Sequence, residues 1–126
     1  MNKHVRLKTS TSVPIYDCGL WLVVAAEPSV VLRGMATTFP NQPEVEPEAF
    51  AALHVWAGSD FGLFFRSDRM RHSIIAHEIL HSTHRIMEYI ECPLTSSTGE
   101  PFAYLNAWIH NWVYSQFKKA GIRVSV

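Results

Sequence analysis

The sequence lacks an excess of charge of either sign. Of its 126 residues, 11 are Lys or Arg and 11 are Asp or Glu, so the formal net charge is zero. It also contains no long basic run, which is the feature that nucleic-acid-binding proteins use to hold phosphates. We therefore expect no nucleic-acid partner.

Long apolar runs are missing as well. The most apolar segment, residues 19–26, is far shorter than the roughly 20 residues that a membrane-spanning helix requires. The first residues, MNKHVRLKTSTS, carry positive charge but lead into no apolar stretch of the signal-peptide type. We expect neither export nor a membrane partner, and hence a cytoplasmic location.

Cysteine is scarce, and internal repeats are absent. Cys18 and Cys92 stand far apart without the CxxC spacing of a thiolate metal site. Two isolated cysteines favour free thiols in a reducing compartment over a disulfide. With 126 residues and 48% hydrophobic content, the chain is large enough for one compact domain but too small for two independent ones, so residues 1–126 are expected to form a single domain.

The first part of the chain has the composition of β-strands. Residues 5–39 are rich in β-branched and aromatic side chains and are interrupted by prolines and glycines, which indicates two or three short strands. The segment 40–47, PNQPEVEP, predicts an exposed loop because its three prolines cannot support a sheet or a helix. Two extended runs, residues 50–56 and 62–66, flank a Gly-Ser-Asp turn and predict a hairpin.

The second part has the spacing of helices. Apolar residues recur with helical periodicity over residues 68–90, and Ser67 or Asp68 can cap the start. A second helix is predicted for residues 100–120, and the last residues, 122–126, are compatible with one more short strand. The sequence thus predicts an α+β fold in which a small, mostly antiparallel sheet packs on two long helices.

Histidine is abundant, with seven residues, and two of them form a metal-binding pattern. Residues 77–81 read His-Glu-Ile-Leu-His in the middle of the first predicted helix. Positions four apart share one face of a helix, so His77 and His81 can direct their ring nitrogens to one zinc ion. Glu78 lies one step around the helix, where it can act on a water molecule bound to that ion.

A catalytic zinc normally has three protein ligands, so a third is expected from elsewhere in the chain. His84 lies about 10 Å along the helix axis from His77, which is too far, and Glu88 and Glu91 are further still. We favour Glu100, at the start of the second helix, because the nine-residue connection before it is long enough to return to the metal. His110 is the rival candidate, since it would lie level with the metal if the two helices pack antiparallel.

These residues suggest a family. HEILH on a helix preceded by a strand, with Glu100 opening another helix about twenty residues later, resembles the zincin metallopeptidases, and within them the gluzincins, whose third ligand is glutamate. The segment EPFAYL after residue 99 is also similar to the second signature of small HExxH proteins encoded by bacteriophages. The resemblance covers about residues 55–117. It implies a zincin-like domain.

The resemblance also implies how such a site works. Zinc held by His77, His81 and Glu100 would lower the pKa of a bound water, and Glu78 would take the proton and pass it to the leaving amine during hydrolysis of a peptide or protein substrate. In that family the strand before the metal helix is a sheet edge that pairs with substrate, and residues 62–66 match it here. A simple core strand fits the same residues equally well. Tyr104 could hydrogen-bond a zinc ligand or stabilise an oxyanion, although many gluzincins have an acidic residue at this place. The alternative, slightly favoured, is an aromatic side chain that only packs.

Two other functions fit the same residues. The chain could be a non-catalytic zinc-binding module of zincin fold that acts in protein interactions, a hypothesis that the small size supports and that the presence of Glu78 opposes. It could also hydrolyse an amide other than a peptide bond. The substrate and the oligomeric state do not follow from the sequence.

Overall fold

The computed structural model describes residues 4–40 and 51–126, and the fold is stated for these. Four strands and three helices form a mixed sheet and the layers on its two sides. In chain order they are β1 (Val5–Val13), β2 (Cys18–Ala25), α1 (Pro28–Arg33), β3 (Ala52–Ala57), β4 (Asp60–Arg66), α2 (His72–Tyr89) and α3 (Gly99–Ala120). The predicted α+β class is confirmed.

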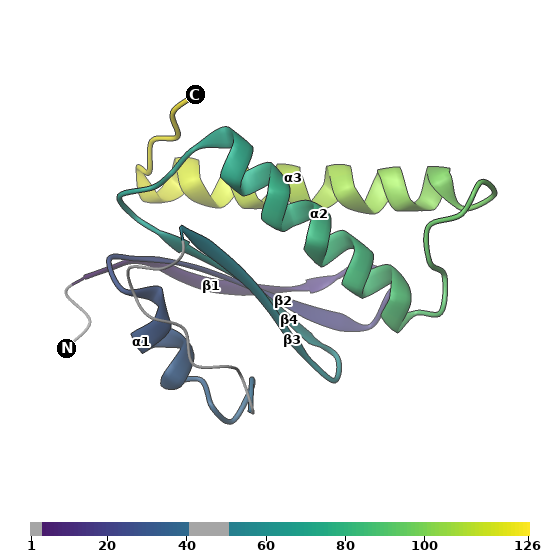
Figure 1. The fold of residues 1–126 in the computed structure, drawn as a ribbon, viewed down its shortest axis with the longest axis horizontal. Helices are drawn as coiled ribbons and strands as arrows, with labels where there is room; N and C mark the ends of the chain where they lie inside the picture. Colours follow the sequence, from purple (N-terminus) through teal and green to yellow (C-terminus); the bar gives the residue numbers. More distant parts are fainter. Residues whose placement is uncertain (1–3, 41–50) are drawn as a thin grey trace.

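The strands lie in the order β1-β2-β4-β3. The outer pairs, β1 with β2 and β3 with β4, are antiparallel, whereas β2 and β4 in the middle are parallel. Parallel neighbours need a crossover connection, and the chain makes it through α1 on one face of the sheet (Figure 1). The sheet is therefore mixed, and this refines the expectation of a mostly antiparallel sheet.

Each face of the sheet is covered by helices. In Figure 1, α2 and α3 lie over one face and α1 lies under the other. Side chains alternate between the two faces along a strand, so in β2 Leu22 packs in the core below α2 and α3, while its neighbour Val23 packs in the core on the α1 side. The middle of β4 carries no polar side chain, because both of its faces are buried.

Three predictions about these elements need correction. The helix α1 falls in residues 5–39, where only strands were predicted. The helix α2 begins at His72 rather than at residue 68, because the Asp68 carboxylate accepts hydrogen bonds from the guanidinium of Arg66, and Arg71 bridges to Ser125 in extended conformation. The segment 62–66 is not a sheet edge, because β4 pairs with β2 on one side and β3 on the other.

The remaining predictions of elements hold where the structure describes them. The hairpin of β3 and β4 turns at Gly58, whose φ of 58° lies in the left-handed region that glycine adopts most readily. A helix, α3, is present over the residues 100–120 where one was predicted, and Ser125 forms an isolated bridge in place of a final strand. The loop predicted for residues 40–47 lies outside the described residues except for Pro40.

Among the described helices, none is long and apolar enough to cross a bilayer.

Gly62 in β4 provides a test of how tightly the sheet packs on the α1 side. A Cβ added there would lie 3.0 Å from ring atoms of Phe39 and Phe64 and 3.1 Å from Val55. We expect Gly62→Ala to lower the free energy of unfolding by about 1–3 kcal/mol, the usual cost of overpacking. The measurement is urea denaturation. The control is Gly99→Ala, where nothing lies within 4 Å, and a loss as large in the control as at Gly62 would contradict the packing.

Cys18 and Cys92 are both free thiols, as predicted, but their surroundings differ. Burial raises the pKa of the Cys18 thiol to about 11, and the carboxylates of Asp17 and Asp60 add to the effect. Only about one in a thousand Cys18 thiols is then ionised at pH 8, and the thiolate is the reactive form.

We therefore expect Ellman's reagent at pH 8 to modify the half-buried Cys92 in the folded protein and to leave Cys18 unmodified. Mass spectrometry after labelling identifies the modified residue. The denatured protein should react at both positions. Rapid labelling of Cys18 in the folded chain would show that its side chain is not buried as described.

Candidate functional site

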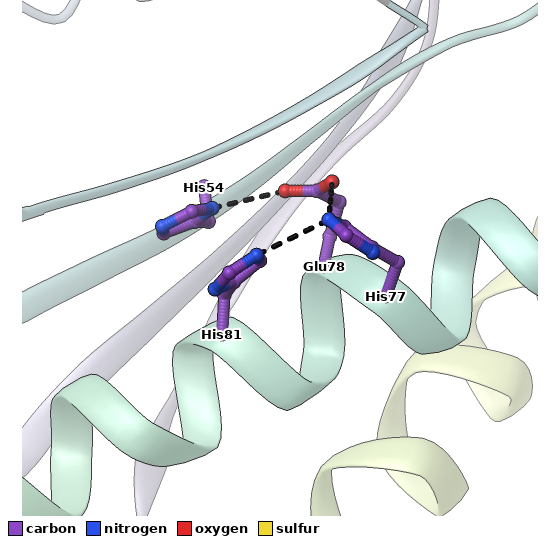
Figure 2. Close-up of polar contacts among 4 residues, drawn as sticks. All are labelled: His54, His77, Glu78 and His81. Atoms are coloured by element: carbon purple, nitrogen blue, oxygen red, sulfur yellow. Dashed lines mark hydrogen bonds and ion pairs between the residues drawn. The ribbon is translucent and has the colours of Figure 1, made fainter.

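The site lies where α2 crosses the strand β3. Residues 52, 54 and 56 of β3 face the helix layer, because Val55 between them packs in the core on the α1 side. In the described sheet β3 is the edge strand. His54 therefore projects from the edge of the sheet toward α2, where it meets the predicted metal-binding residues (Figure 2).

Glu78 makes a hydrogen-bonded contact between the helix α2 and the strand β3. Its side chain points from α2 toward the sheet, and the residue is only 9% exposed. It is the only charged side chain that is buried among residues 4–40 and 51–126. Its Oε1 lies 2.9 Å from Nδ1 of His54. Because an ionised carboxylate can only accept, the ring nitrogen of His54 donates this hydrogen bond.

His77 and His81 lie one helical turn apart, as predicted, and their rings converge. Their Nε2 atoms are 3.1 Å apart. The second oxygen of Glu78, Oε2, lies 3.8 Å from Nε2 of His77. Figure 2 shows the two rings and the carboxylate directed to one region beside α2. The side chain of His77 is 65% exposed, so solvent reaches this region.

Stacked rings tie the site to the strand. The ring of His54 lies between the rings of His81 and Trp56, with centroids 4.4 Å and 5.7 Å away and planes within 12° of parallel. The guanidinium of Arg85, also on α2, covers Trp56 at 3.9 Å from the ring centroid. The edge of the sheet and the helix are therefore joined by one continuous stack of side chains.

The surroundings of His81 favour its neutral form. Loss of water around the ring, and then the nearby His54, lower the pKa of His81, while the Glu78 carboxylate acts in the opposite direction. A histidine with a lowered pKa is uncharged at neutral pH, and the uncharged ring is the form that binds metals.

The spacing of the two nitrogens fits a metal-binding pair. Two histidine nitrogens bound to one zinc at about 2.0–2.1 Å with tetrahedral angles lie about 3.3–3.4 Å apart. The observed separation of 3.1 Å is close to this value. Without an ion, the same separation allows one ring to donate a hydrogen bond to the other. Within residues 4–40 and 51–126, no three His, Cys, Asp or Glu side chains are arranged to hold an ion together.

The other predicted site residues lie on α3, apart from this region. Glu100 is exposed in the first turn of α3, and Tyr104 is 72% exposed. His110 bonds through Nδ1 to the backbone oxygen of Asn106. On α2, the ring of His84 packs against Phe102. In the described chain, no hydrogen bond or ion pair joins any of these side chains to His77 or His81, and their roles remain predictions.

The position of α3 around α2 explains this separation. Thr83 marks the side of α2 that faces α3, because its hydroxyl donates to the side-chain oxygen of Asn106. With about 100° of rotation per residue, His81 lies about 160° from Thr83 around the helix. The histidine pair therefore faces away from α3 and toward β3.

His54 is the residue of the site that the sequence did not reveal. It precedes the motif by 23 residues and falls in the apolar run FAALHVW, where it belongs to no metal-binding motif. A signal is present in the strand periodicity, since His54 is a polar residue at an inward position between Leu53 and Val55. Using that signal would have required knowing that α2 packs over the hairpin.

Comparisons with protein families, with curated proteins and with solved structures found no match to this chain.

Trp56 can report directly on an ion bound by the pair, because its ring is separated from His81 only by the ring of His54. We expect Cu²⁺, the divalent ion that nitrogen sites of this kind bind most tightly, to quench part of the tryptophan fluorescence. That part should disappear in Trp56→Phe.

Trp21→Phe is the control, because Trp21 packs on the other face of the sheet, and it should leave the quenching intact. His77→Ala should abolish this quenching in the parent protein and in Trp21→Phe. Equal quenching with and without Trp56 would mean that the ion binds elsewhere.

Proposed function

We propose that the chain is a zinc-dependent metallopeptidase in which His77 and His81 bind the ion and Glu78 is the general base. One observation carries the proposal: two Nε2 atoms 3.1 Å apart, with a carboxylate oxygen 3.8 Å from one of them. Two imidazoles on one helical face supply two of the three protein ligands of a catalytic zinc, and a neighbouring carboxylate is the usual base for its water.

Each residue has a distinct task in this proposal. Zinc, when bound, supplies a Lewis acid that polarises the substrate carbonyl and lowers the pKa of water. His77 and His81 would hold the ion on the solvent-facing side of α2, where a peptide can approach. The free Oε2 of Glu78 accepts a proton from the attacking water and returns it to the leaving amine. Peptide hydrolysis needs no further covalent chemistry from the chain.

Glu78 favours a catalytic role over a purely structural metal site. A structural zinc is closed by four protein ligands and has no use for a base. Here a charged side chain is kept buried beside the histidine pair, although charged side chains are seldom buried. The alternative, a zinc-binding module for protein interactions, predicts zinc binding without hydrolysis and is an outcome of the following test.

The first test separates metal binding from chemistry. We expect the purified protein to bind one zinc per chain and to cleave unstructured peptides. Glu78→Gln should keep the zinc and lose about 10²–10⁴-fold in rate, because the amide cannot accept the proton. His77→Ala should lose the zinc. Metal analysis and a quenched-peptide assay give the two measurements.

His4→Ala is the control for the first test, because His4 lies outside the site and is exposed. It should match the parent protein in both measurements. The mechanism is wrong if Glu78→Gln cleaves as fast as the parent, and the metal site is wrong if His77→Ala retains its zinc.

The third ligand is tested separately. Glu100 stays the proposed one from the sequence, although it lies on α3 and the histidine pair faces away from that helix in this structure. If Glu100 completes the site, Glu100→Gln should weaken zinc binding in a competition titration with a chelator, and His110→Gln should not. The opposite result would assign the ligand to His110. If both variants bind zinc as tightly as the parent protein, water or substrate fills the remaining positions on the ion.

A further inference from the structure

We infer that His54 is a positioning residue that fixes the carboxylate of Glu78 for its role as base. The inference rests on the proposed function. Its basis is the 2.9 Å hydrogen bond between Nδ1 of His54 and Oε1 of Glu78. The two residues are 24 positions apart in the chain, one on the strand β3 and the other on the helix α2. Both side chains are largely shielded from water, at 20% and 12% exposed.

The bond distinguishes the two oxygens of the carboxylate. Oε1 accepts the hydrogen from His54, whereas Oε2 is the oxygen 3.8 Å from Nε2 of His77. A glutamate side chain has three rotatable bonds, and without a partner it would sample many positions. With Oε1 fixed, Oε2 remains directed to the region between the two metal-binding rings (Figure 2).

His54 is itself held in place, which a positioning residue requires. Its ring is stacked between His81 and Trp56, and Trp56 is covered by Arg85. The side chain of Arg85 is further bound to Glu88. The ring of His54 therefore cannot turn without separating a stack of four side chains, and its Nδ1 stays directed at Glu78.

A purely structural role for the same bond makes a different prediction. If His54 only fastens β3 to α2, its loss should reduce stability and leave the chemistry of the folded protein unchanged. If it positions the base, its loss should reduce kcat in protein that is still folded and still loaded with zinc. Partners that orient functional groups around metal sites typically contribute about 10–100-fold.

The test uses His54→Phe, which keeps a ring in the stack and removes the donor, and His54→Asn, which restores a donor near the place of Nδ1. In zinc-loaded protein we expect His54→Phe to lower kcat by about 10–100-fold with little change in KM. His54→Asn should recover part of the loss. In the Glu78→Gln background, His54→Phe should cause no further loss, because the group it positions is gone.

A matched control is available at the other end of the same helix. His72 bonds through Nδ1 to the hydroxyl of Tyr114 at 2.8 Å and stacks on its ring. His72→Phe removes the same kind of bond and keeps a ring, so it should change stability in a similar way and leave kcat unchanged. If it lowers kcat as much as His54→Phe, the effect is structural and the inference is wrong.

A spectroscopic measurement tests the contact without reference to activity. In ¹⁵N NMR spectra of the zinc-loaded protein, Nδ1 of His54 should carry the hydrogen. The opposite tautomer, with the hydrogen on Nε2, would overturn the inference.

Failure of the inference and failure of the proposed function are distinguishable. A parent protein that binds zinc and cleaves peptides, with His54→Phe equally fast, overturns the role of His54 alone. A parent protein that shows no zinc-dependent cleavage overturns the proposed function, and the positioning role with it.

Discussion

The hydrogen bond between His54 and Glu78 is the interaction on which the arrangement of the site depends. The buried face of α2 is otherwise apolar or uncharged, with residues such as Ile75, Ile79 and Ile86 packed on the sheet. A carboxylate on such a face needs a hydrogen-bond donor. In the described structure that donor comes from β3, and the pairing fixes which part of α2 lies over the edge of the sheet. His77 and His81 are brought to the same edge because they share the helix with Glu78.

The order of the strands sets where this edge is. The chain crosses from β2 through α1 before it returns for the hairpin, and β4 then lies parallel to β2 inside the sheet. This leaves β3 on the outside, under α2. A site on β4 would be covered by strands on both sides, whereas a site between α2 and β3 is open to solvent, as the exposure of His77 shows.

Much of this fold follows from local patterns in the sequence. Helical periodicity located α2 and α3, and the Gly-Ser-Asp turn located the hairpin, because these patterns depend on neighbours in the chain. The helix α1 was missed because its Val30 and Val31 are β-branched residues typical of strands. For residues 62–66 a substrate-pairing edge and a core strand were both open, and the structure shows the core strand. The run Leu63-Phe64-Phe65 does not alternate with polar residues, which is typical of an inner strand covered on both faces.

The site was predictable only in part, because the sequence pattern shows relations between neighbours in the chain and not the packing of distant segments. The spacing of His77 and His81 identified a pair on one helical face, since that relation is local. His54 joins the pair through the packing of two distant segments, which no pattern within either segment specifies. A third ligand depends on tertiary packing in the same way, so the choice between Glu100 and His110 stays a prediction.

The burial of Glu78 is the strongest argument that the cluster has a chemical purpose. A buried polar pair contributes little to stability compared with well-packed apolar side chains of similar volume. For packing alone, an isoleucine at position 78 would continue the pattern of Ile75 and Ile79 and would leave His54 unneeded. Places where a sequence departs from its own local pattern are commonly functional sites. The same bond that satisfies Oε1 leaves Oε2 directed toward Nε2 of His77, 3.8 Å away. The base that we propose would need this combination of a fixed position and an oxygen open to solvent.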